Sequence, residues 1–208
     1  RRMVNAEEGI ENLSTEVDAL IVIPNQRLMD VIDRKVTLIE AFKVADGVVA
    51  HGVQGISEII TTPGLINVDF ADVRMIMKDA GSALLGIGTG VGESRAQMAA
   101  RAAISSPLLE ISIEGAKGVL FNISGGPDMT MNEVDEAAKI IAETADADAN
   151  IIFGARIDER LSDQIRVTVI ATGFDEMRAR LSKMVAKDEL EEPVPQPSDV
   201  VSEVPDKE

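Results

Sequence analysis

The chain has 208 residues, a formal net charge of −16 and no cysteine. The charge argues against a nucleic-acid surface, which needs clustered Lys and Arg to displace counterions, and against docking on anionic lipid. The lack of cysteine excludes disulfide bonds, and no apolar run reaches the roughly 18 residues that a membrane-spanning helix needs.

The first 60 residues predict helices around one short strand. We expect a helix over 2–13, a strand over 19–23 and a second, short helix over 26–32. The strand is expected to be buried and parallel, because its apolar run is unbroken. Thr37 and Glu40 form a capping-box pattern at the start of a long helix over 38–60, which Pro63-Gly64 ends.

The long helix repeats apolar residues every three or four positions, which is typical of a stripe that faces a core. These residues are Leu38, Phe42, Ala45, Val49, Val53, Ile56 and Ile60. At 1.5 Å per residue the helix would be roughly 35 Å long, the diameter of a small domain. Charged and polar residues interrupt the pattern, so we expect a helix that spans a domain and not a membrane.

After the long helix, helical and strand patterns alternate. Helices are expected over 70–80, 93–104 and 131–145. Strands are expected over 82–87, 118–123, 150–157 and 164–171, the last with alternating apolar and polar residues. The series predicts an α/β sandwich with helices covering one face of the sheet. Residues 187–208 hold eight acidic residues against two lysines, and four of the eight prolines, so they cannot bury a core and predict a disordered tail.

The stretch Asn67-Val68-Asp69-Phe70-Ala71-Asp72 is the most informative about chemistry. Asp69 suits the N-cap of the helix over 70–80, and Asp72 its first turn, where carboxylates satisfy free N–H groups. Spacing alone favours this capping role. The same corner would also present two carboxylates and the amide of Asn67 to solvent, where they could orient a water for attack on a phosphoryl group. The two roles are compatible, because a capped helix start is a rigid mount.

Two other patterns suggest sites that the chemistry does not support. The glycine-rich run 86–92 lies between a strand and a helix, as phosphate-binding loops do. Its spacing is not G-x-G-x-x-G, no Lys-Ser/Thr follows, and Glu93 would place a negative charge where phosphate should sit. We therefore expect a structural connection from strand to helix. His51 has no second ligand at metal spacing, so no metal site is predicted.

Several segments together resemble the FtsZ family of tubulin-like GTPases, in order from Arg1 to about Phe174. The segment 62–72 resembles the synergy loop of the family, and the others are GVQGI (52–56), AISSPLLE (103–110), GVLFNI (118–123) and RVTVIATGF (166–174). The resemblance implies four parts. They are the end of a Rossmann-like GTP-binding domain (1–37), a central connecting helix (38–61), an α+β C-terminal domain with a mostly β sheet covered by helices (62–174), and an acidic tail (175–208).

The resemblance further implies an active site that two subunits of a filament share. One subunit would hold GTP or GDP with Mg²⁺, and the next would complete the site with Asp72 and Asp69, which polarise the attacking water, and Asn67, which assists. The positions that match the guanine-nucleotide contacts of the family are Arg2, Asn25, Phe42 and Asp46. From the residues alone, a core role for Phe42 and a turn role for Asn25 are more common.

The chain also departs from the family. The glycine-rich signature that wraps the phosphates is absent, so we expect a piece of a longer protein that neither binds GTP tightly nor hydrolyses it alone. Gly47 lies inside the long helix, at a cost of about 1 kcal/mol relative to Ala, and leaves Asp46 to contact the base. The tail lacks the terminal peptide by which many bacterial relatives grip membrane tethers, so the tether and a bacterial or archaeal source stay open.

As a relative of FtsZ, the chain is expected to self-associate head to tail in the cytoplasm, at the mid-cell division site. Its tail is expected to reach membrane tethers and division proteins, with neither nucleic-acid binding nor membrane insertion. Two alternatives stay open: a non-catalytic module that binds filament ends, and a tubulin-superfamily cytoskeletal protein of cell shape.

Overall fold

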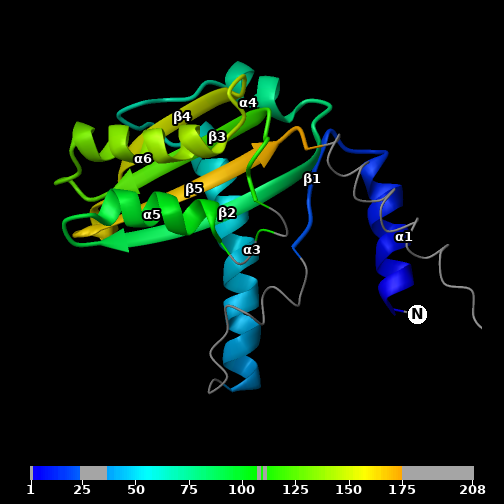
Figure 1. Cartoon of the computed structure of the whole chain (residues 1–208). Helices are drawn as coiled ribbons and strands as arrows, with labels where there is room; N and C mark the ends of the chain where they lie inside the picture. The colour runs from blue at the N-terminus through cyan, green and yellow to red at the C-terminus, as the bar shows by residue number, and fades with distance from the viewer. Residues whose placement is uncertain (1, 24–36, 107–108, 110–111, 175–208) are drawn as a thin grey trace, which may run out of the picture. The chain divides into compact units, whose positions relative to one another are not determined.

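The computed structural model describes residues 2–23, 37–106, 109 and 112–174 (Figure 1). Its strands are β1 (Ala19–Ile21), β2 (Gly81–Val91), β3 (Gly118–Gly125), β4 (Asn150–Ile157) and β5 (Gln164–Thr172). Its helices are α1 (Arg2–Ser14), α3 (Leu38–Thr61), α4 (Phe70–Met77), α5 (Arg95–Ile104), α6 (Met131–Thr144) and the short 3-10 helix η1 (Glu159–Leu161). The helix expected over 26–32 and the acidic tail lie outside the described residues.

The strands form one five-stranded sheet in the order β1-β2-β5-β3-β4. β1 runs parallel to β2, and β3 runs parallel to β4, whereas β5 is antiparallel to both of its neighbours. The parallel pairing expected for the first strand is confirmed, although its residues are only half-buried. β1 thus shares a sheet with strands from 62–174, and the domain boundary at residue 37 stays a prediction.

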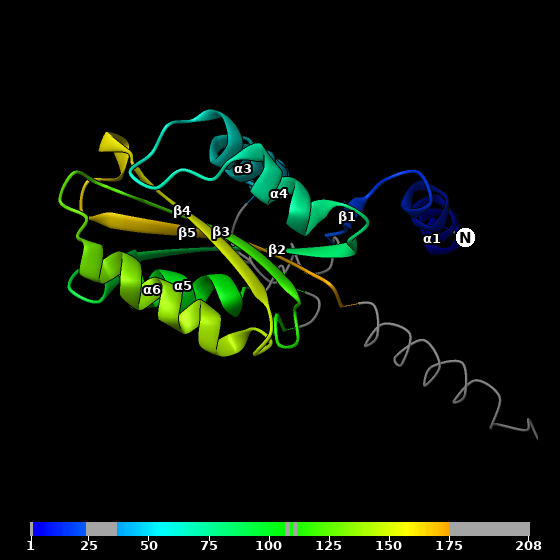
Figure 2. The same cartoon turned by 90° about the horizontal axis from the view of Figure 1, so that it is seen from above.

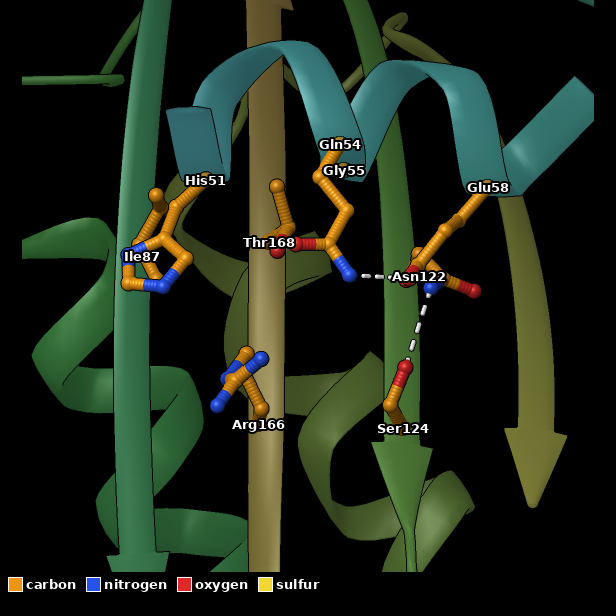
Figure 3. A pocket seen from close by; sticks show the side chains of 9 residues that line it. All are labelled: His51, Gln54, Gly55, Glu58, Ile87, Asn122, Ser124, Arg166 and Thr168. Carbon is orange, nitrogen blue, oxygen red and sulfur yellow. Dashed lines mark hydrogen bonds between the residues drawn. The ribbon is translucent and has the colours of Figure 1, made fainter. Parts of the chain in front are cut away.

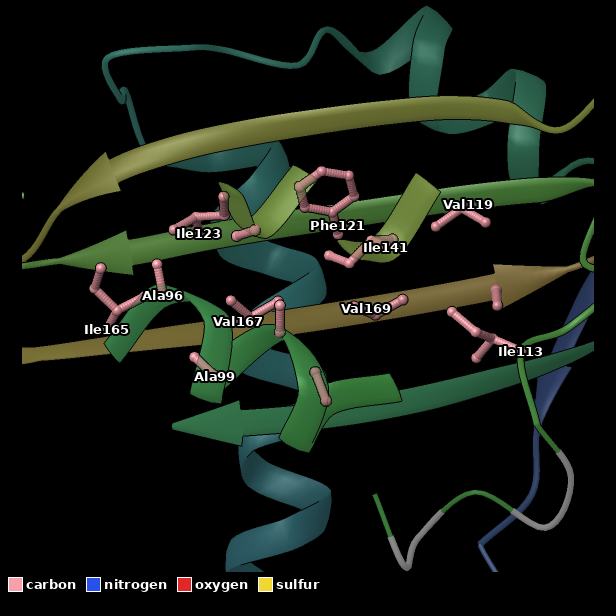
Figure 4. Close-up of a cluster of buried hydrophobic side chains, with 14 of the residues drawn as sticks. Ala96, Ala99, Ile113, Val119, Phe121, Ile123, Ile141, Ile165, Val167 and Val169 are labelled. Atoms are coloured by element: carbon pink, nitrogen blue, oxygen red, sulfur yellow. The ribbon is translucent and has the colours of Figure 1, made fainter. Parts of the chain in front are cut away.

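Helices cover both faces of the sheet (Figure 2). On one face α5 and α6 pack over apolar side chains of β3 and β5, including the buried Phe121, Val167 and Val169 (Figure 4). On the other face, α4 and the C-terminal end of α3 cover a second apolar cluster, which includes Leu120 and Ile170. The prediction that helices cover one face only is wrong, because the central strands carry apolar side chains on both faces.

The glycine-rich run is part of a strand. β2 extends to Val91, beyond the expected end at 87, so the expected connection over 86–92 is mostly strand. Gly86, Gly88 and Gly90 lie against the backbone of α5, whose Ala99 and Ala103 are fully buried. Alternating glycines leave room for the helix backbone to approach the strand, which explains the run without any ligand.

The long helix is confirmed, but only part of its expected apolar stripe is buried, with Ile56 packed against the sheet. Phe42, Val49 and Val53 are exposed, whereas Ile59 packs against the sheet. Two glycines of α3 also approach the sheet closely: Gly52 lies against Leu85 and Gly55 against Thr168. Small residues let a helix approach a sheet without an apolar side chain, so periodicity alone could not identify this face.

A buried arginine joins the starts of α5 and α6. The Arg95 side chain, 8% exposed, binds Asp128 through Nη1 and Glu133 through Nε, each at 2.6 Å. Glu133 also completes a capping box with Thr130, accepting its backbone N–H at 2.8 Å. Hydrogen bonding from Arg95 is the main cause that lowers the pKa of Glu133.

Candidate functional site

The corner between α3 and α4 carries the three polar residues singled out from the sequence. Asp69 is the N-cap of α4, and its Oδ1 accepts the Asp72 N–H at 2.8 Å. Asp72 lies in the first turn. The Oδ1 of Asn67 accepts the Gly64 N–H at 2.7 Å, which ties the start of the loop to its middle. The capping role predicted for Asp69 is therefore confirmed.

The loop is fixed to the edge strand β4. Ala155 O accepts N–H bonds from Leu65 at 2.7 Å and from Ile66 at 3.1 Å, and Ala155 N–H donates to Ile66 O at 3.0 Å. A Cβ on Gly64 would overlap the carbonyl oxygen of Ala155, so only glycine fits this approach. Val68, between Asn67 and Asp69, is buried. These backbone bonds make the loop an extension of the sheet.

The polar groups at the corner face solvent. Asn67 and Asp69 are exposed and Asp72 is half-buried. Among the described residues, no side chain pairs with the Asp72 carboxylate, and one oxygen of Asp69 is left after capping. Two apolar side chains beside them are also exposed, Leu65 at 62% and Phe70 at 65%. The corner thus combines free carboxylate oxygens with apolar contact area, as a surface for a macromolecular partner would.

Phe42 and Asp46 lie together but away from this corner. Both are exposed, one turn apart near the start of α3, and the loop follows the end of that helix. From Asp46 to the end of α3 at Thr61, a rise of 1.5 Å per residue gives roughly 22 Å. One copy of the chain therefore cannot bring them to the loop acids. Arg2 is the first residue of α1, and Asn25 lies outside the described residues.

An arginine network beside the loop was missed by sequence reasoning. Nη1 of Arg156 lies 3.2 Å from Glu58 Oε1 on α3, and Nη2 lies 2.8 Å from Asp158 Oδ2. Arg160 also binds Asp158, and this is the main cause that lowers the pKa of Asp158. No local pattern could reveal the network, because α3 and β4 are far apart in the sequence.

A small polar cleft lies between α3 and the sheet (Figure 3). His51, Gln54 and Glu58 enter it from α3, opposite polar side chains of β3 and β5 that include Asn122 and Arg166. Gln54 Nε2 donates to Glu58 Oε1 at 2.6 Å, which orients that carboxylate (Figure 3). Within the described ranges, no three His, Cys, Asp or Glu side chains gather to hold a metal ion. In the same residues, no helix is long and apolar enough to cross a bilayer.

Comparison with known proteins identifies the domain that carries the sheet. Residues 81–175 match the sequence profile of the FtsZ family, C-terminal domain. This chain carries an FtsZ-family C-terminal domain. The matched region begins at β2 and contains β3, β4 and β5, which confirms the expected tubulin/FtsZ fold. The corner over 64–72 lies before it in the chain, separated from it by residues 73–80.

Solved structures of FtsZ itself are similar to this chain. An empty dimer of FtsZ from M. jannaschii matches 84% of the chain at 44% identity, with a TM-score of 0.79, and a mutant of that protein matches 83% at 45% identity, with a TM-score of 0.78. The chain spans about half of each, 51% and 52%. CetZ2 from Haloferax volcanii, in a GTPγS-bound protofilament, matches 89% of the chain and 57% of its own length at a TM-score of 0.63. Its 16% identity shows the fold alone.

Proposed function

We propose that this chain is the C-terminal half of a GTPase that polymerises with GTP, and that its synergy-loop corner activates hydrolysis in the neighbouring subunit. The observation that carries the proposal is the corner itself: Asn67, Asp69 and Asp72 project from a capped loop that backbone bonds fix to β4. A rigid, exposed mount is what a site completed by a second subunit requires.

The chemistry follows from these groups. Asp72, with a carboxylate free of described partners, would accept a hydrogen bond from the attacking water and align it with the terminal phosphate of GTP. The second oxygen of Asp69 and the amide of Asn67 would hold the same water in place. General-base and positioning effects of this kind contribute about 10²–10⁴-fold to rate.

The next subunit would hold the nucleotide, through its own Phe42 and Asp46. Both residues are exposed on α3, where the ring can stack on a base and the carboxylate can accept N–H groups of that base. Magnesium is usually bound through one or two carboxylates and the phosphates of the substrate. The described residues offer no three-residue cage, so the ion would arrive on the nucleotide and neutralise its charge next to the loop acids.

Self-association supports hydrolysis in trans. The exposed Leu65 and Phe70 beside the acids give the corner an apolar contact surface, and the similar FtsZ from M. jannaschii was solved as a dimer. We propose that head-to-tail contact places each corner against the nucleotide of a neighbour, in filaments at the mid-cell division site. Imaging a fluorescent fusion in dividing cells tests the location, and an even distribution through the cell would contradict it.

Substitution of Asp72 in the full-length protein tests the proposal. We expect Asp72→Ala to bind GTP normally but to lower GTP turnover per polymerised subunit by about 100-fold or more. Asp79→Asn is the matched control, because it removes one negative charge beyond the other end of α4. Turnover near the wild-type rate in Asp72→Ala would leave the carboxylate with no role beyond the helix start.

A further inference from the structure

The strand that holds the loop also holds α3. Ala155, which bonds the loop through its backbone, packs into the core under α5 and α6. Side chains alternate along a strand, so the next residue, Arg156, projects to the opposite face, where α3 lies. There its Nη1 is 3.2 Å from Glu58 Oε1, in the last turns of the helix.

This guanidinium is held on two sides in a partly buried setting. The side chains of Arg156 and Glu58 are 12% and 19% exposed, and that of Asp158, on the second side, is 10% exposed. Gln54 fixes the Glu58 carboxylate from the preceding helical turn. Solvent screens such a partly buried bridge less than it screens a fully exposed ion pair.

Arg156 contacts both ends of the segment that joins α3 to the loop. Its side chain binds Glu58 at the near end. Its backbone lies under Gly64 at the far end, where an added Cβ would sit 3.5 Å from Arg156 Cα. Gly64 in turn donates its N–H to Asn67. The connection from Glu58 to Gly64 is thus closed into a ring by one residue.

We propose that Arg156 is a positioning residue for the synergy-loop corner. Its guanidinium sets the distance between the end of α3 and β4, and thereby the place from which Asn67, Asp69 and Asp72 reach a neighbouring subunit. Its Nε is buried without a partner among the described residues, so the two Nη groups alone hold the guanidinium there. The consequence for catalysis rests on the proposed function, whereas the positioning of the loop does not.

Hydrogen exchange in the full-length protein tests the positioning directly. The amides of Gly64 and Asp72 are bonded within the loop, so they report its local opening. We expect Arg156→Gln to speed exchange in peptides covering 62–72 by about tenfold, with β3 and β5 unchanged, and Arg156→Lys to restore part of the protection. Arg160→Gln is the control, because Arg160 binds Asp158 but is 75% exposed, and no hydrogen bond or ion pair joins it to α3 among the described residues.

GTP turnover supplies the second measurement. A misplacement of about 1 Å can cost on the order of 100-fold in rate, so Arg156→Gln should lower kcat per polymerised subunit by about 10–100-fold while KM and GTP binding by the monomer stay unchanged. Glu58→Gln should act similarly, and the double variant should be no worse than either single one.

Two results would overturn the proposal. One is unchanged exchange over 62–72 in Arg156→Gln. The other is an increase of the same size in β3 and β5, which would reduce the bridge to general stability. If the wild-type protein does not hydrolyse GTP at all, the proposed function fails, but the exchange data still decide whether Arg156 positions the loop.

Discussion

Replacing Gly88 by Ala is expected to destabilise the protein, although Ala restricts the unfolded chain more than Gly does. A Cβ on Gly88 would overlap the carbonyl oxygen of Ala99 and lie 2.9 Å from the carbonyl carbon of Ala102, both in the backbone of α5. A flexible side chain could rotate away from such a clash, but the backbone of a packed helix cannot. Either α5 must move off β2 or the strand must bend.

The size of the effect follows from competing terms. Forcing extra atoms into a well-packed core typically costs about 1–3 kcal/mol. The entropic gain of about 0.4–1 kcal/mol from replacing Gly by Ala applies only where the native site accepts the side chain without strain. Gly86 and Gly90 make the same close approach to α5, so the helix cannot tilt about Gly88 to relieve the clash. We expect a net loss of about 1–3 kcal/mol in the free energy of unfolding.

Gly47→Ala is the matched control, because it is the same substitution at an open site. A Cβ there meets no atom within 4 Å, and Gly47 lies inside α3. Alanine is favoured over glycine in a helix by about 1 kcal/mol, so this variant should gain stability. Urea unfolding of the 208-residue chain, followed by circular dichroism, measures both variants. Shifts in the same direction, or an unchanged midpoint for Gly88→Ala, would refute the close packing of β2 against α5.

Three further outcomes are expected. Glu133→Ala removes a cap and leaves the buried Arg95 with Asp128 alone, so it should cost about 2–4 kcal/mol in urea unfolding; a loss below 1 kcal/mol would contradict the bridge. The lowered pKa of Glu133 means that its contribution is complete above the unfolded value of about 4.3 and is lost as the pH falls through its lower folded value. Unfolding free energies measured from pH 6 to pH 2 should therefore fall less steeply in Glu133→Gln. Asp69→Asn keeps a good N-cap, so the midpoint of unfolding should stay within about 0.5 kcal/mol of wild type, while GTP turnover by the full-length protein drops; equal loss of both would assign Asp69 to stability alone.

Local signals were sufficient for much of the secondary structure. The capping boxes at Thr37 and Thr130 begin α3 and α6, and Asp69 caps α4. These features depend on residues within one helical turn, so the sequence displays them directly. The expected strands and helices are present over the described residues, with β2 longer than predicted because its glycines look like a loop.

The sequence likewise reveals some parts of the candidate site and not others. Asn67, Asp69 and Asp72 could be found from the sequence, because they are adjacent along the chain and resemble a known loop. The contacts that fix this loop could not be found from the sequence. They come from the backbone of Ala155 and the side chain of Arg156, on a strand that is distant along the chain. Whether Asp72 acts on a nucleotide stays a prediction.

The sequence by itself determined most of the helices and strands, where α3, α4 and α6 begin, and which residues could do chemistry. Only the tertiary structure decided which face of α3 is buried, which strands are neighbours, and how the loop is held. The physical reason is one of range. Caps and periodicity act over three or four residues, whereas the contacts of Gly55 with Thr168 and of Glu58 with Arg156 exist only once the sheet has brought distant segments together.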